Sequence, residues 1–173
     1  ILTEKILQFL EKRKIGKVVL AGHSIGGMFA IEFTYQHPDK VKKLFLIDSA
    51  GVESKESTAS FVWDFLRSHS AHWSLKKIGE DVKAFHRMLK SPMAYGRIAR
   101  FARRTSLKEQ AQSIKAPTII LLGEKDDLVP LSLTEIMHGW ISGSKLIVLK
   151  DMDHDWIIHS PELFWEIVKT QAE

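Results

Sequence analysis

The sequence has 173 residues, of which 45% are hydrophobic and 27% charged, the composition of one ordinary globular domain with enough apolar side chains for a core. The net charge is +4, which is much lower than the charge expected of a nucleic-acid-binding protein with a dense stripe of basic residues. The sequence has no run of about 18 apolar residues, so it predicts no membrane span. Cysteine is absent, which excludes disulfides, a thiolate nucleophile and a cysteine-based metal site.

An amphipathic helix is predicted at the start of the chain, because apolar residues recur at helical spacing from Leu2 to Leu10 and Gly16 then ends the pattern. Ile1 stands where a complete protein would have methionine, so we expect the natural N-terminus to lie upstream. The sequence therefore leaves a signal peptide open, and a cytoplasmic location is our expectation.

A short apolar strand is predicted over residues 17–21, and it runs directly into a Gly-x-Ser-x-Gly motif at 22–26. The strand is β-branched and shows no polar alternation, which predicts a parallel strand that is buried on both faces. A strongly apolar helix follows at once and ends before Pro38, since the residue before a proline disfavours the α conformation. This order of strand, turn and helix is the context in which the motif carries a nucleophilic serine.

Ser24 lies at the turn of this motif, where its hydroxyl would be exposed. The tight turn needs neighbours without side chains, and Gly22 and Gly26 provide them. The backbone N–H of Ile25 would point at the oxyanion that forms when Ser24 attacks a carbonyl group. The simpler alternative is that the glycines only punctuate a loop and that Ser24 caps the helix.

The rest of the chain continues to alternate between strands and helices, which predicts an α/β fold with a mainly parallel sheet flanked by helices. Residues 52–114 interrupt this alternation, since they show no strand signal and indicate several short helices with aromatic side chains. We predict that this insertion is a helical cap and that the core comprises 1–51 and 115–173. The further strands are expected at 43–47, 118–122 and 145–149, with helices near 131–140 and from residue 161 onward.

Three reactive side chains follow the carboxyl ends of predicted strands, the edge at which parallel sheets gather ligands and catalytic groups. They are Ser24, Asp126 and His154. A serine hydroxyl is a poor nucleophile until a base takes its proton, and a histidine with a near-neutral pKa can be that base. A carboxylate can hold the imidazole in the required tautomer.

Three motifs in this order make the chain resemble the cap-bearing serine hydrolases of the α/β-hydrolase fold superfamily, which are related to esterases and carbon–carbon bond hydrolases. The motifs are the glycine-rich turn at 22–27, Gly-x-x-Asp-x-x-x-Pro at 123–130, and a histidine followed by Pro161-Glu162. The resemblance covers the whole chain but only the later, C-terminal part of that fold. It therefore implies that the chain is truncated at its N-terminus.

The resemblance implies that Ser24 is the nucleophile, Asp126 the orienting acid and His154 the base, with the N–H of Ile25 as one oxyanion donor. It implies a hydrolase that cleaves a small ester or related acyl bond through an acyl-enzyme, with a small-molecule substrate, no cofactor and no metal. A carbon–carbon bond hydrolase acting on diketone-like compounds and a non-catalytic, ligand-binding or inert fragment are the alternatives.

A second oxyanion donor comes, in the family, from a His-Gly loop after an earlier strand. The His-Gly pair of this sequence, His138-Gly139, lies between the predicted acid and base and cannot be that loop. We therefore expect the second donor outside this chain. We also expect the first strand, Val18-Val19-Leu20, to be an apolar edge.

Several neighbouring residues compete for the same roles. Asp127 adjoins Asp126, but the spacing of the motif favours Asp126. Asp48 ends the second strand, a position that some relatives use for the acid, and we expect it to be a hydrogen-bonding loop residue. His23 is expected to pack under the turn, and His159 to be structural.

The acidic residues around His154 also suggest other roles. Asp151, Asp153 and Asp155 could form a metal cluster with it, but successive side chains point in different directions and no second histidine has ligand spacing, so we expect no metal. Asp153, where relatives usually have glycine, could raise the pKa of His154.

A basic face is predicted within the insertion, where Arg97, Arg100 and Arg104 share one side of a helix. A solvated surface is the default interpretation, and an anion clamp for a carboxylate-bearing substrate is the alternative. We expect neither nucleic acid nor a membrane as a partner, and the oligomeric state stays open.

Overall fold

The computed structural model describes residues 2–54 and 92–171. They belong to two compact units, one formed by Ile1–Val52 with Ser106–Glu173 and the other by Glu53–Thr105. The second unit is shorter than the predicted insertion at 52–114, and most of the aromatic residues expected there lie outside the described residues. A cap function for this segment therefore stays a prediction.

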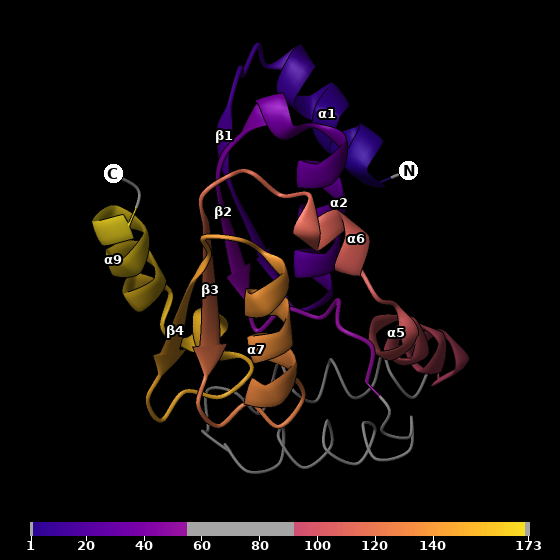
Figure 1. The fold of residues 1–173 in the computed structure, drawn as a ribbon, viewed down its shortest axis with the longest axis vertical. Coiled ribbons are helices and arrows are strands. Elements are labelled where there is room, and N and C mark those ends of the chain that lie inside the picture. Colours follow the sequence, from indigo (N-terminus) through magenta and orange to yellow (C-terminus); the bar gives the residue numbers. More distant parts are fainter. Residues whose placement is uncertain (1, 55–91, 172–173) are drawn as a thin grey trace. The chain divides into compact units, whose positions relative to one another are not determined.

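The first unit is built on a parallel sheet in which the strands follow their order in the chain, β1-β2-β3-β4 (Figure 1). In the register of the sheet, Phe45 lies between Ala21 and Ile119. This sheet confirms the predicted α/β fold, and because all its strands are parallel, their carboxyl ends meet at one edge. The strands are β1 (Val18–His23), β2 (Val41–Ile47), β3 (Thr118–Gly123) and β4 (Lys145–Leu149).

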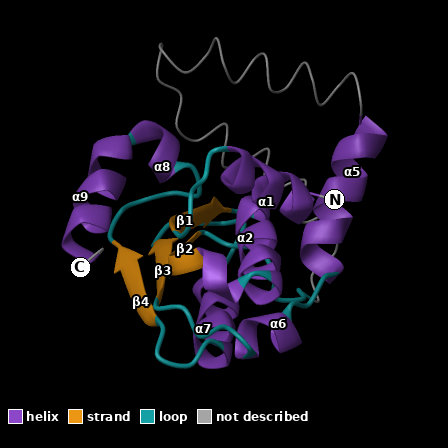
Figure 2. Cartoon of the chain, turned by 90° about the horizontal axis from the view of Figure 1, so that it is seen from above, coloured by secondary structure: helices purple, strands orange, loops and turns teal. Residues whose placement is uncertain are grey.

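Helices cover both faces of the sheet (Figure 2). On one face, α2 (Ile25–Gln36) packs on β1 and β2, α7 (Leu131–Trp140) packs on β3 and β4, and α6 (Lys108–Gln112) contacts both helices. The helix α1 (Leu2–Lys12) packs against α2. The other face carries α9 (Pro161–Gln171), which contacts the short helix α8 (Trp156–His159). A short 3-10 helix, η1 (Pro38–Lys40), leads into β2.

The core under α9 is an aromatic and aliphatic cluster centred on Phe45, Ile119 and Leu121. The ring of Phe164, on α9, meets that of Phe45 edge-on with their centroids 6.1 Å apart. Trp156 joins the cluster and is almost fully buried, although the sequence did not predict the four-residue helix α8 that carries it. These contacts fix the loop after β4 against the sheet.

The prediction that the first strand is buried on both faces is wrong. Val19 is 42% exposed and Ala21 is also exposed, whereas Phe45 in β2 is fully buried. The reason is that β1 lies at the edge of the described sheet and pairs only with β2. This position agrees with the other prediction, that the first strand is an apolar edge.

The described part of the second unit contains α5 (Pro92–Arg104). Arg97, Arg100 and Arg104 are exposed on it, whereas Arg103 is buried and donates from Nη2 to the hydroxyl of Ser54 at 3.0 Å. Of the helices in residues 2–54 and 92–171, none combines the length and the apolar character that crossing a membrane requires.

Candidate active site

Ser24 occupies a strained turn between β1 and α2. Its φ of 54° and ψ of −122° are rare for a residue with a side chain. The turn is held by hydrogen bonds, because Ser24 donates its N–H to Ile47 at 2.9 Å and its carbonyl accepts the N–H groups of Gly27 and Ala50 at 3.0 and 3.1 Å. The serine is therefore anchored by its backbone to the end of β2.

Two glycines allow α2 to approach the sheet at this turn. A Cβ atom on Gly22 would lie 2.5 Å from the carbonyl oxygen of Gly26, and one on Gly27 would overlap the side chain of Ser49. By contrast, a Cβ on Gly26 would meet nothing within 4 Å. The prediction that Gly26 provides the required space is therefore wrong, and Gly27 is the second close approach.

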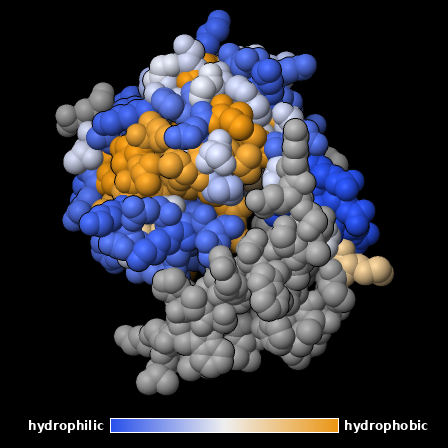
Figure 3. Space-filling view, turned by 60° about the horizontal axis from the view of Figure 1, so that its bottom comes forward, coloured by the Kyte–Doolittle hydropathy of each residue, from blue (hydrophilic) through white to orange (hydrophobic). Residues whose placement is uncertain are grey.

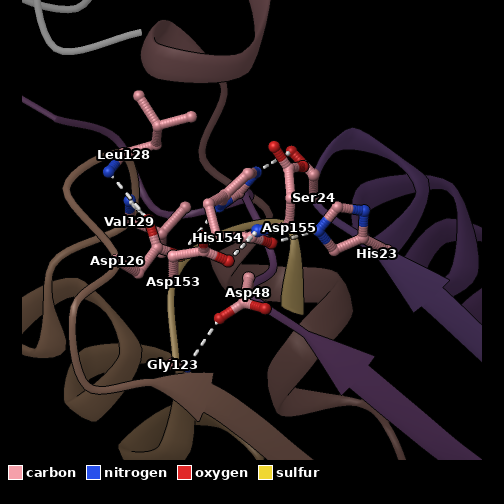
Figure 4. A network of polar contacts seen from close by, with 10 residues as sticks. All are labelled: His23, Ser24, Asp48, Gly123, Asp126, Leu128, Val129, Asp153, His154 and Asp155. Atoms are coloured by element: carbon pink, nitrogen blue, oxygen red, sulfur yellow. Dashed lines mark hydrogen bonds and ion pairs between the residues drawn. The ribbon is translucent and has the colours of Figure 1, made fainter. Parts of the chain in front are cut away.

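His154 links the serine to a carboxylate in one hydrogen-bonded chain (Figure 4). Its Nδ1–H donates to Oδ2 of Asp126 at 2.7 Å, and its Nε2 lies 3.0 Å from Oγ of Ser24. Both side chains of the His154–Asp126 pair are buried. With the proton on Nδ1, Nε2 has a free lone pair that can accept the hydroxyl proton of Ser24.

The loop after β3 orients Asp126. Its Oδ1 accepts the backbone N–H groups of Leu128 and Val129 at 2.7 and 2.9 Å, which leaves Oδ2 for the histidine. Asp127, the competing carboxylate, has an exposed side chain. The structure therefore brings Asp126, as the spacing of the motif favoured, into contact with His154.

Gly123 lets the loop after β4 approach the loop after β3. A Cβ atom at this position would lie 2.6 Å from the carbonyl oxygen of Asp153 and 2.7 Å from that of Met152. The backbone N–H of Lys125 also donates to Met152 at 2.7 Å. This close approach brings the histidine loop next to the loop that carries Asp126.

The pKa of His154 is raised despite its burial. Burial lowers it, but the hydrogen bond and the charge of Asp126, followed by the charges of Asp48 and Asp155, outweigh that effect. The side chain of Asp153, which the sequence suggested for this role, accepts the N–H of Asp155 at 3.1 Å.

His23 joins the serine turn to the histidine loop. Its Nε2–H donates to the backbone carbonyl of His154 at 2.8 Å, and the two rings are 4.9 Å apart at 43°. Burial and the charge of His154 lower the pKa of His23, so the ring is neutral near pH 7. The sequence predicted only that His23 packs here, because no local pattern indicates a bond between residues 131 positions apart.

Asp48 lies beside this site but does not pair with the histidine. Its Oδ1 accepts the N–H of Gly123 at 2.8 Å, which confirms the expected hydrogen-bonding loop residue. Burial and the charge of Asp126 raise the pKa of Asp48 to about 8. Among residues 2–54 and 92–171, no three or more histidine, aspartate or glutamate side chains are grouped to hold a metal ion, and His159 is exposed at the end of α8.

Comparison with known proteins agrees with the fold described above. The family model described as alpha/beta hydrolase fold matches residues 2–86. A monoacylglycerol lipase, abhd6-A of Xenopus laevis, is 28% identical over 91% of this chain and 56% of the lipase. A pimeloyl-(acyl-carrier protein) methyl ester esterase from a Neisseria meningitidis serogroup C strain is 25% identical over 89% of this chain and 69% of the esterase.

Solved structures agree with the sequence relatives. A meta-cleavage product hydrolase from Pseudomonas fluorescens superposes with a TM-score of 0.72 at 20% identity, over 96% of this chain and 68% of the hydrolase. The chain thus spans just over half of the lipase's length and about two thirds of the length of the other two relatives. The structure, the family model over residues 2–86 and these relatives agree with the resemblance, and the chain has the fold of the α/β-hydrolases.

Proposed function

We propose that this chain is a serine hydrolase that cleaves a small ester or a related acyl bond through a covalent acyl-enzyme. The observation that carries the proposal is the chain of two hydrogen bonds from Asp126 through His154 to Ser24. An imidazole activates a serine hydroxyl when it can accept the proton, and a carboxylate on the other nitrogen keeps the ring in the required tautomer.

In the acylation step, Oγ of Ser24 attacks the carbonyl carbon of the ester while Nε2 of His154 takes the hydroxyl proton. The carbonyl oxygen becomes an oxyanion, and the backbone N–H of Ile25 donates to it, since the first N–H groups of a helix have no acceptor within that helix. The intermediate then expels the alcohol, which receives the proton from Nε2. Ser24 is left as an acyl ester.

In the deacylation step, a water molecule loses a proton to Nε2 of His154 and attacks the acyl carbon. The second tetrahedral intermediate collapses, Oγ of Ser24 leaves and takes back the proton, and the carboxylic acid is released. Asp126 stabilises the imidazolium in both steps. The raised pKa of His154 is consistent with a base that must hold a proton in each intermediate.

Carboxylic esters are the preferred substrate class. Two relatives are named as a monoacylglycerol lipase and a methyl ester esterase, and both names describe ester hydrolysis. A patch of hydrophobic residues, with hydrophilic residues around it, is exposed on one face of the molecule (Figure 3). An apolar acyl group would bind to apolar surface of this kind.

Labelling with a fluorophosphonate tests the proposal, because this probe reacts with a serine that its base has activated. We expect labelling of the folded chain at Ser24, located by mass spectrometry and abolished by Ser24→Ala. His154→Ala should slow labelling by roughly 100-fold or more. Ser132→Ala is the control, because Ser132 is an exposed serine on α7 that should not react.

The outcome also separates the alternatives. Labelling at Ser24 followed by turnover of esters supports the proposal, whereas turnover of diketones alone favours the carbon–carbon bond hydrolase. A folded chain that is not labelled, or that is labelled equally fast in His154→Ala, overturns the proposal and favours the non-catalytic alternative. A cytoplasmic location remains a prediction.

A further inference from the structure

Asp48 is a buried carboxyl group that the proposed reaction does not use. It follows β2 directly, its side chain is fully buried and its φ is 45°. The N–H of Gly123 donates to Oδ1 at 2.8 Å, but no donor among the described residues reaches Oδ2. A buried, charged carboxylate oxygen that accepts no hydrogen bond lowers the free energy of unfolding, and this favours the protonated form of the group.

Two ionisable groups face Asp48 from neighbouring loops (Figure 4). Asp126, after β3, lies close enough to share a proton with it and acts on it through its charge, and His154, after β4, acts through its charge. Asp126 already accepts N–H groups from Leu128, Val129 and His154, whereas Asp48 accepts one. Two adjacent carboxylates away from water repel strongly, so the pair retains one proton, on the carboxyl group with fewer donors.

We propose that Asp48 is protonated at neutral pH and that its Oδ2–H donates a hydrogen bond to the Asp126 carboxylate, which makes Asp48 a positioning residue for the acid. The proton gives Oδ2 a partner and removes the repulsion between the two groups. Burial, followed by the charge of Asp126, raises the pKa of Asp48 to about 8, while the N–H of Gly123 and the charge of His154 oppose the shift. Below that pH, the pair faces His154 with a single negative charge.

The protonation state can be measured without any reference to activity. Carbon-13 NMR of the full chain, labelled at its aspartate carboxyl groups, would follow the resonance that disappears in Asp48→Asn. We expect this resonance to titrate with a midpoint near pH 8. A midpoint near the ordinary value of 3.8 would overturn the inference.

The pH dependence of unfolding gives a second, independent measurement. Between pH 3.8 and about 8, folded Asp48 keeps a proton that the unfolded chain has released, so rising pH favours unfolding. Asp48→Asn removes this linkage. The ratio of the unfolding constants of the wild type and Asp48→Asn should therefore rise about tenfold per pH unit until folded Asp48 itself titrates, or about 500-fold from pH 5 to pH 8 in urea titrations.

Asp39→Asn is the matched control for this measurement, because the side chain of Asp39 is 73% exposed. The same ratio for this variant should stay within about threefold over the whole range. A ratio for Asp48→Asn that is as flat as that of the control would overturn the inference.

The positioning role rests on the proposed function and is tested through Ser24. Asparagine at position 48 can still donate to Asp126, so Asp48→Asn should keep the fluorophosphonate labelling rate at pH 7 within about threefold. Asp48→Ala loses the donor and should be slower by roughly tenfold or more, with circular dichroism confirming the fold. Equal rates in the two variants would overturn the positioning role. If the wild type is not labelled at all, the proposed function fails, while the NMR titration still decides where the proton lies.

Discussion

The Gly22→Ala substitution probes how closely α2 approaches the sheet. The added methyl carbon would lie 2.5 Å from the carbonyl oxygen of Gly26, 2.7 Å from Cα of Gly27 and 2.8 Å from Cβ of Ala30. Carbon contacts prefer about 3.5–4.0 Å, so the backbone of α2 must move away from β1 by about 1 Å. Overpacking of this kind costs about 2 kcal/mol, and in a chain of this size that lowers the melting temperature by roughly 4–8 °C.

Thermal unfolding of three proteins checks this reasoning. Gly26→Ala is the matched control. It makes the same substitution four residues further along the chain, but its methyl group meets no atom within 4 Å. Alanine is favoured over glycine in a helix by up to about 1 kcal/mol, so Gly26→Ala should melt at or above the wild-type temperature. Equal melting temperatures for all three proteins, or an equal loss in both variants, would refute the reasoning.

Three further variants test the site and its surroundings. Asp126→Asn should slow fluorophosphonate labelling by roughly 1,000-fold or more. The pH at which labelling becomes fast should also fall, because His154 loses the partner that raises its pKa. Labelling rates measured across pH 5–9 check both effects. His23→Phe should lower the unfolding free energy by about 1 kcal/mol, measured in urea, because the carbonyl of His154 loses its donor. Lys125→Ala should leave the urea midpoint unchanged, because its ion pair is exposed.

The strands and the major helices could be predicted because their signals are local. The strand at 145–149 and the helix at 131–140 have the predicted bounds, and the last helix begins at the predicted Pro161. Each of these segments combines a hydrophobic period with a glycine, a proline or a polar cluster at its ends. The order of Ser24, Asp126 and His154 along the chain, together with their positions after strands, likewise needed no knowledge of distant contacts.

The parts that could not be predicted depend on close approaches between distant segments. Whether Gly26 or Gly27 faces the sheet depends on the path of α2 past Ser49, which no spacing within the motif indicates. The hydrogen bond from His23 to His154 and the proximity of Asp48 to Asp126 also arise only when three loops meet. Burial of the first strand was mispredicted because apolar composition alone does not tell an edge strand from a central one.

The hydrogen bond between Ser24 and His154 joins residues 130 positions apart, and this separation has a consequence for folding. Pairing of β1 with β2 closes a short stretch of chain, whereas pairing of β2 with β3 must wait for the closure of a long loop that includes residues 53–105. Parallel pairings of such long range form slowly. We therefore expect the hydrogen bond between Ser24 and His154 to form only after β4 has paired with the sheet. The rate at which Ser24 becomes reactive during refolding should then report the last stage of folding.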